Sequence, residues 1–266
     1  MALWDKIKYS SGIAYLNNVF IYEVDIEKAN INILYSKGLI TKDIYDYLYN
    51  SERMVRQVYI GKLQRDVKYT KALQQGIIEA KAQLFQANDI KDFEVLSIKN
   101  DAVFLINRIP SIRDFGLIHF IPKNVYTSFY TVGNLEMYYY YNSISKEEKL
   151  DIKGLGDSVI ETHRDYMYQF LCDLFYTIQC NGIEVAIRLM KEFYIQYINL
   201  KLPLGYYRKF DISNEFHFKS RTSMGTGYSI NNINESMLPL IDISYNLRIL
   251  ITLQKILDNM YFNKFR

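Results

Sequence analysis

The sequence predicts an α+β fold in which an antiparallel sheet is backed by helices and followed by a helical C-terminal part. Short apolar runs at 95–98 and 102–106 flank the tripeptide Lys99-Asn100-Asp101, and such runs around Asn and Asp are typical of a β-hairpin. Apolar residues then recur with a period of two over 117–141, and helical spacing follows over 157–200. Strands followed by a block of helices indicate the α+β class.

The N-terminal part is expected to contain one strand and then helices. Residues 19–26 read as a strand that ends near Asp25. Apolar residues at helical spacing predict a helix over 31–39, and a second over 41–50. The segment 51–85 is expected to form one long helix or two broken ones, with a basic side.

The second half of the chain is expected to change from sheet to helix. Three antiparallel strands, "LIHFI", "VYTSFYTV" and "LEMYYYY", are separated by turn signals at 122–124 and 133–134. The charged, glycine-containing stretch "SKEEKLDIKGLGD" is the expected domain boundary, which divides the chain into domains 1–145 and 146–266. The C-terminal domain is expected to contain helices over 157–180, 183–200 and 241–262 and an irregular basic stretch over 201–235.

Composition sets limits on the class of protein. The chain has 266 residues, 23% charged residues and a net charge of +3, which permits nucleic-acid binding through a local patch without requiring it. Cys172 and Cys180 lie in an apolar helix and are expected to be reduced, as in the cytoplasm of a host cell. No apolar run approaches the ~18 residues of a membrane span, so no membrane partner is expected. The Tyr, Ile, Asn and Lys usage is typical of an AT-rich source such as a phage or a low-GC bacterium.

Two carboxylates are the candidate catalytic residues. Asp25 ends the first apolar strand and Asp101 lies at the hairpin tip, so the two side chains could meet at one edge if these strands are neighbours. Carboxylates on rigid strands suit Mg²⁺, and two such ions can stabilise the attacking and leaving oxygens of a phosphoryl transfer. Arg53, Arg56 and Lys62 are the candidate ligands of a nucleotide triphosphate.

Simpler interpretations stay open for each of these residues. Asp101 can serve only the turn, and Asp25 can be a helix N-cap. Arg53 and Arg56 can belong to a solvated helix face. Glu23 shares the strand face of Asp25 and can be a third ligand, but it is expected to be a solvated charge.

Two segments resemble palm motifs of template-directed polymerases, and the family B DNA polymerases most of all. "EVDIEKANINIL" is similar to the first palm motif, in which Asp25 matches the metal-binding Asp and Asn30 matches a Tyr. "LSIKNDAVF" is similar to the third motif, a hairpin tip with Asp-Thr-Asp, in which Asp101 matches the second Asp. Lys99 occupies the place of the first Asp. The resemblance covers about residues 19–131.

The resemblance implies a palm-like domain with short helical fingers at about 41–87, followed by a thumb-like domain. "IPKNVYTSFY" resembles the Lys-x-x-Tyr strand that contacts the primer, which implies that role for Lys123 and Tyr126. A loop with Lys219 and Arg221 is expected to touch a nucleic-acid backbone. The implied function is that of a Mg²⁺-dependent, DNA-directed nucleotidyltransferase with DNA, rather than RNA, as partner.

The missing hairpin Asp and the short fingers favour an alternative function. In it the chain is a polymerase-derived subunit without catalytic activity, which binds nucleic acid or assembles with other subunits of a larger phage complex. A third interpretation, an unrelated α+β structural protein, holds if Asp25 and Asp101 lie far apart. The sequence determines neither the template type nor the preferred sugar.

Overall fold

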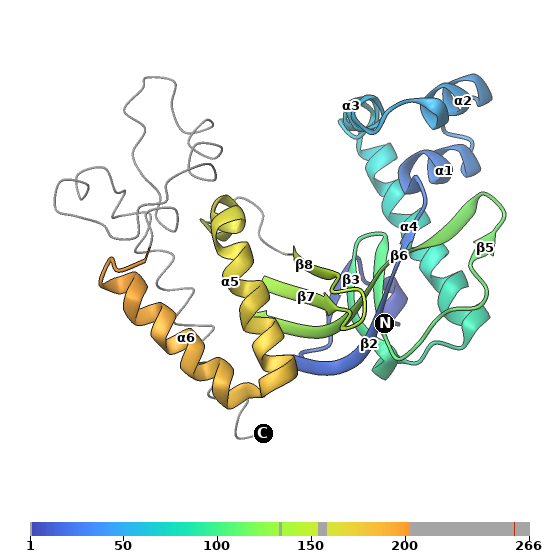
Figure 1. Ribbon diagram of the computed structural model, residues 1–266. Coiled ribbons are helices and arrows are strands. Elements are labelled where there is room, and N and C mark those ends of the chain that lie inside the picture. Colours follow the sequence, from blue (N-terminus) through green and yellow to red (C-terminus); the bar gives the residue numbers. More distant parts are fainter. Residues whose placement is uncertain (1, 133–134, 154–158, 203–257, 259–266) are drawn as a thin grey trace, which may run out of the picture. The chain divides into compact units, whose positions relative to one another are not determined.

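The computed structural model describes residues 2–132, 135–153, 159–202 and 258, which form a mixed α+β fold (Figure 1). Within this part the chain has six α-helices and eight antiparallel β-strands. The chain divides into two compact units, unit 1 with residues 1–13 and 19–125, and unit 2 with residues 14–18 and 126–266. This division falls inside a strand, whereas the boundary predicted at 145/146 falls in a turn between two strands.

Unit 1 combines a sheet with four helices. The strands lie in the order β1-β3-β4-β2-β6, and β5 pairs with β6. The strands are β1 (Lys8–Ser10), β2 (Tyr15–Ile26), β3 (Val95–Lys99), β4 (Ala102–Ile106), β5 (Asp114–Phe115) and β6 (Ile118–Val132), of which β2 and β6 continue into unit 2. The helices are α1 (Ala29–Ser36), α2 (Lys42–Asn50), α3 (Arg53–Leu63) and α4 (Val67–Asn88), with short 3-10 turns η1 (Leu3–Asp5) and η2 (Asp92–Glu94).

The β3–β4 hairpin and β2 are neighbours in the sheet, as the sequence predicts. Lys99 pairs with Ala102 across the hairpin, and Asp25 on β2 pairs with the same Ala102. Asn100 takes the left-handed conformation in the turn (φ 57°), which Asn tolerates better than most residues. The hairpin tip therefore lies beside the end of β2.

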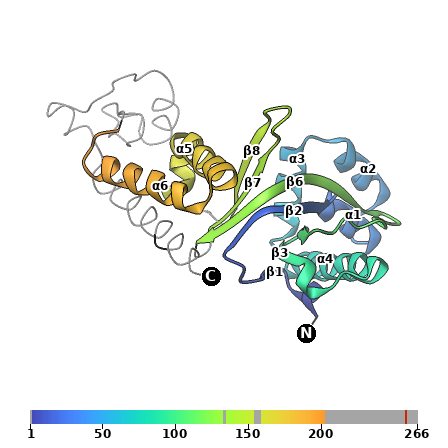
Figure 2. The same ribbon diagram turned by 60° about the horizontal axis from the view of Figure 1, so that its bottom comes forward.

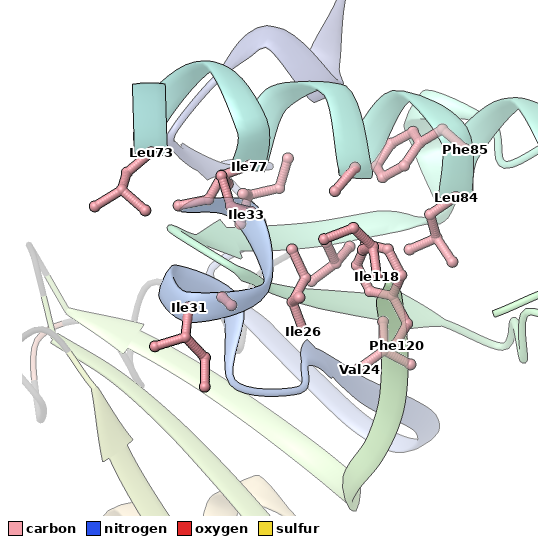
Figure 3. Packing of buried hydrophobic residues seen from close by; sticks show 14 of the residues in the cluster. Val24, Ile26, Ile31, Ile33, Leu73, Ile77, Leu84, Phe85, Ile118 and Phe120 are labelled. Atoms are coloured by element: carbon pink, nitrogen blue, oxygen red, sulfur yellow. The ribbon is translucent and has the colours of Figure 1, made fainter. Parts of the chain in front are cut away.

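A hydrophobic core lies between the sheet and the helices of unit 1. Figure 3 shows α4 side chains above α1 and the strands, with Ile33 and Ile77 side by side. Gly76 on α4 lets the two helices approach, because a Cβ placed there would lie 2.2 Å from the Ile33 Cγ2 atom. Ile33, Leu84 and Val24 are at most 1% exposed. Helix α4, which belongs to the expected fingers segment, thus also backs the sheet.

The expected turn at Pro122 is wrong, because β6 runs without interruption through this position. Proline lacks an N–H and is tolerated in a strand where no partner strand needs that donor. Among the described pairings, β5 reaches β6 only at Ile118 and His119, and β7 joins β6 from Ser128 onward. Pro122 lies between these two contacts, so the strand continues past it.

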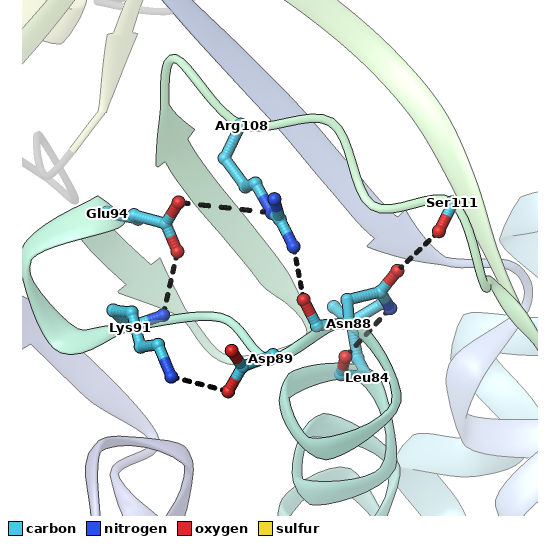
Figure 4. A network of polar contacts seen from close by, with 7 residues as sticks. All are labelled: Leu84, Asn88, Asp89, Lys91, Glu94, Arg108 and Ser111. Atoms are coloured by element: carbon cyan, nitrogen blue, oxygen red, sulfur yellow. Dashed lines mark hydrogen bonds and ion pairs between the residues drawn. The ribbon is translucent and has the colours of Figure 1, made fainter.

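A polar network fixes the end of α4 to the chain that follows β4 (Figure 4). The Asn88 side chain donates to the carbonyl oxygens of Leu84 and Ile112, and its oxygen accepts from the Ile112 N–H. Arg108 donates to the Asn88 carbonyl oxygen, and its Nε atom lies 3.9 Å from Glu94 Oε1 in an ion pair. The last carbonyl groups of a helix have no N–H partner within the helix, and the Arg108 side chain supplies a donor for that of Asn88 in α4.

The described part of unit 2 is built on the remaining residues of β2 and β6, with two further strands and two helices. These elements are β7 (Leu135–Tyr141), β8 (Glu148–Lys153), α5 (Val159–Asn181) and α6 (Ile183–Ile198). Within the unit, α5 packs against α6 and against β7 and β8 (Figure 2). Strand β8 lies in the stretch expected to be a linker, and it pairs with β7 through Leu150 opposite Tyr139. Alternation of buried Leu150 and Ile152 with more exposed neighbours is the strand signal in this stretch.

Several expectations lie outside the described residues. The basic stretch expected over 201–235, with Lys219 and Arg221, lies there apart from residues 201 and 202. The C-terminal helix expected over 241–262 also lies there, apart from residue 258. Cys172 is buried, Cys180 is exposed, and both are free thiols. No helix in the described part of the chain is long and apolar enough to cross a membrane.

Candidate metal and nucleotide site

A pocket of about 340 Å³ in unit 1 contains both candidate carboxylates. Asp25 comes from the end of β2, and Asp101 comes from the tip of the β3–β4 hairpin. The pocket is completed by the start of α1, by one side of α3 and by Lys123 on β6. The structure therefore brings together residues that lie 76 positions apart in the sequence (101 − 25).

Asp25 has one engaged and one open carboxylate oxygen. Lys123 Nζ donates to Asp25 Oδ2 at 2.6 Å, while Asp25 Oδ1 is buried and has no hydrogen-bond partner among the residues that the structure describes. The side chain as a whole is 18% exposed. The N-cap interpretation of Asp25 is wrong, because the residue that precedes α1 is Lys28. A buried acceptor without a donor is costly, so Oδ1 is the natural position for a ligand with positive charge.

Asp101 is held close to Asp25 in a partly buried position. Burial raises the pKa of Asp101, and the negative charge of Asp25 raises it further. A hydrogen bond from its own backbone and the positive charges of Lys123 and Arg53 act in the opposite direction. Asp101 thus keeps its turn role and also belongs to a cluster of opposing charges.

Basic groups surround the rest of the pocket. Arg53 and Arg56, one turn apart on α3, line it together with Lys28 and Asn30 at the start of α1. Arg56 also donates to the Ser51 carbonyl oxygen, which holds its guanidinium in place. The start of a helix and planar guanidinium groups are both suited to phosphate oxygens.

The other predicted site residues lie elsewhere. Lys62 is exposed on α3 and is not among the residues that line the pocket. Tyr126 belongs to unit 2 and is fully buried, and its hydroxyl donates to Asp151, so its ring offers no open face to a nucleic acid. The primer contact that the resemblance implies for Tyr126 is therefore not part of the proposed site.

Sequence reasoning missed three features of the site. Glu23 is 1% exposed rather than solvated, and Asn124 donates to its carboxylate. Lys28 is held over the Tyr49 ring, 3.3 Å from the ring centroid, and also donates to the Tyr49 carbonyl oxygen. The ion pair between Asp25 and Lys123 joins strands that are far apart in the sequence. Only the alternation along β2, which puts Glu23 and Asp25 on one face, could have indicated part of this arrangement.

The donor set fits a hard divalent cation. Mg²⁺ is commonly bound by one or two carboxylates, with substrate phosphates and water as its other ligands. Asp25 Oδ1 and the Asp101 carboxylate supply oxygens of this kind. No group of three or more His, Cys, Asp or Glu side chains able to hold a metal lies within the described residues. The pocket thus offers two carboxylates for such an ion.

The chain matches a family model described as the Bacteriophage PBS1 gene 130 protein over residues 1–259, and it belongs to this family. This finding confirms the phage source that the composition suggests. The family description names no activity. A search of curated proteins found no match.

Proposed function

We propose that the chain is a nucleotidyltransferase related to the palm of template-directed polymerases. The observation that carries the proposal is the meeting of Asp25 and Asp101 in one pocket with Arg53 and Arg56. The strand order supports it, because β2 lies directly beside the β3–β4 hairpin, as the resemblance implies. A pair of carboxylates beside basic groups is the arrangement that phosphoryl transfer needs.

In this proposal different residues bind the metal ion, the triphosphate and the nucleic acid. Asp25 and Asp101 hold Mg²⁺, which when bound would neutralise charge on the transferred phosphate. Arg53 and Arg56 grip the triphosphate, and residues at the start of α1 line the same pocket. The basic segment from Arg53 to Lys71 has six Lys or Arg residues and one Asp, hence a net charge of +5, while the whole chain has +3. This segment favours a polyanionic partner, and DNA is the partner that we propose.

Primer extension tests the proposal with DNA and RNA templates, Mg²⁺ or Mn²⁺, and all four dNTPs or rNTPs. We expect Asp25→Asn and Asp101→Asn to lose incorporation by ~100-fold or more, and the double variant to be little worse, because the two groups act as one unit. Both variants should still bind nucleic acid. The matched control is Asp46→Asn, which changes an exposed carboxylate on α2 outside the pocket. Undiminished extension by Asp25→Asn would contradict the assignment.

One observation favours the second candidate function, a binding or assembly subunit without activity. Lys99 holds the position of the first hairpin carboxylate, so the site has fewer metal ligands than the polymerases it resembles. In that case the wild type gives no extension under any condition, yet it binds nucleic acid with an affinity that falls steeply with salt. Charge reversal at Arg53 and Arg56 would weaken this binding, whereas Asp25→Asn would not.

A further inference from the structure

Lys123 places a positive charge against one carboxylate oxygen of Asp25. Its ammonium group contacts Asp25 Oδ2 at 2.6 Å, and it lines the same pocket as Asp101. The Lys123 side chain is 48% exposed and the Asp25 side chain 18% exposed, so the ion pair is partly shielded from solvent. Among the described residues, Asp25 thus has a positive partner on one oxygen and no hydrogen-bond partner on the other.

We propose that the Lys123 ammonium takes the place of a second cation beside Asp25, so that this pocket binds one divalent ion instead of two. The proposal rests on the proposed function, because it concerns the ion that Asp25 and Asp101 would share. It gives Lys123 a role in ion binding in place of the primer contact that the resemblance implies.

The charges in the pocket support a single ion. The formal charges of Asp25 and Asp101 sum to −2, and Lys123 reduces this to −1 before Lys28, Arg53 and Arg56, which also line the pocket, are counted. One divalent ion brings the three groups to +1, whereas two would bring them to +3 beside two arginines. Charges a few ångströms apart interact strongly even at a protein surface, so the second ion is disfavoured. Lys99 in place of a hairpin carboxylate removes the oxygen ligand that a second ion would need.

The open oxygen indicates where the single ion binds. Within the described part of the chain Asp25 Oδ1 is buried without a hydrogen-bond partner, while Oδ2 accepts from Lys123. Asp101 lines the same pocket and is next in sequence to Ala102, the residue that pairs with Asp25 across the sheet. An ion at Oδ1 would satisfy the buried acceptor and relieve the repulsion between the carboxylates without displacing Lys123.

The test is Mn²⁺ binding to the full chain, measured by the electron paramagnetic resonance signal of free Mn²⁺ and by calorimetry. We expect one ion per wild-type chain. Lys123→Met should bind Mn²⁺ more tightly by about tenfold or more, because a competing unit charge is removed. Lys123→Gln serves as a second variant that keeps a polar side chain, and it should shift the affinity in the same direction. Lys37→Met is the matched control, since Lys37 forms a 2.7 Å ion pair with Glu79 outside this pocket.

The outcomes separate the two proposals. Two ions bound by the wild type, or one ion with an affinity that neither Lys123 variant changes, would overturn the role of Lys123 and leave the metal site intact. Absence of Mn²⁺ binding by the wild type and by both Lys123 variants would overturn the metal site itself, and with it the proposed function. An equal gain in Lys37→Met would show a general charge effect and would also overturn the role of Lys123.

Discussion

Replacement of Gly76 by alanine gives the sharpest test of the packing between α1 and α4. The new Cβ would lie 2.2 Å from Ile33 Cγ2 and 3.2 Å from both Ile33 Cγ1 and Lys37 Cε. Ile33 is 1% exposed and packed in the core, so its side chain must shift to make room for the new methyl group. Overpacking of this kind costs ~1–3 kcal/mol, while alanine in a helix interior recovers ~1 kcal/mol. We expect a net loss of up to ~2 kcal/mol in the free energy of unfolding.

Gly61 supplies a matched control, because it lies inside α3 and a Cβ there would meet nothing within 4 Å. Gly61→Ala should therefore stabilise the protein by ~0.5–1 kcal/mol. The single tryptophan, Trp4, contacts Phe85 on α4 at 5.9 Å between ring centroids, so its fluorescence during urea unfolding reports on unit 1. In an Ile33→Ala background, Gly76→Ala should become stabilising. Stabilisation by Gly76→Ala in the wild-type background, equal to that at Gly61, would refute the close approach of the two helices.

Two further predictions concern buried polar groups. Burial lowers the pKa of Lys81 to about 8, against the smaller opposing effect of Asp5 and Asp101, and its ammonium donates to the Lys6 carbonyl oxygen. Because the unfolded chain holds this proton up to a higher pH, the free energy of unfolding should rise between pH 8 and 9.5, by at most ~1.4 kcal/mol per pH unit. The free energy of unfolding, measured from Trp4 fluorescence, should no longer rise over this pH range in Lys81→Met. A rise that persists in this variant would come from another group. Tyr126→Phe removes the hydrogen bond to Asp151 and should destabilise unit 2 by ~1–3 kcal/mol, seen as faster amide exchange in β6 and β8, with nucleic-acid binding unchanged. If Tyr126→Phe binds nucleic acid more weakly and its amide exchange is not faster, Tyr126 contacts the nucleic acid and the prediction is wrong.

The sequence predicted the elements whose signals are local. The hairpin of β3 and β4 and the helix α2 were predicted closely, because turn chemistry and apolar spacing act within a few residues. In the structure the Thr41 side chain caps α2 by accepting from the Ile44 N–H. β5 has only two residues, too few for any periodic signal. Pro122 misled the prediction, because only the pairing around it shows that its missing N–H costs nothing there.

The candidate site was predicted in part for a similar reason. Apolar runs placed Asp25 and Asp101 at strand ends, and the sheet order then brought them together. Tyr126 shows the opposite case. Its motif depends on which face of β6 it occupies, and that face is the interior of unit 2, where Tyr126 lies 5.2 Å from Tyr138 between ring centroids. A one-residue change of register exchanges the two faces of a strand, so a short motif cannot determine exposure.

The arrangement of charges itself argues that the pocket serves a ligand. Two carboxylates held near each other repel; burial raises the pKa of Asp101, and the negative charge of Asp25 raises it further. Hydrophobic residues at these positions would fold unit 1 with less strain, since a buried ion pair adds little to stability. Lys123 compensates only one oxygen of Asp25 and leaves Oδ1 buried without a donor. An acceptor of this kind is expensive for the fold unless a cation or a donor from a substrate completes it. The two carboxylates line one pocket with Arg53 and Arg56. Binding of a phosphate ligand and its metal ion in this pocket would offset the free-energy cost of the unsatisfied oxygen.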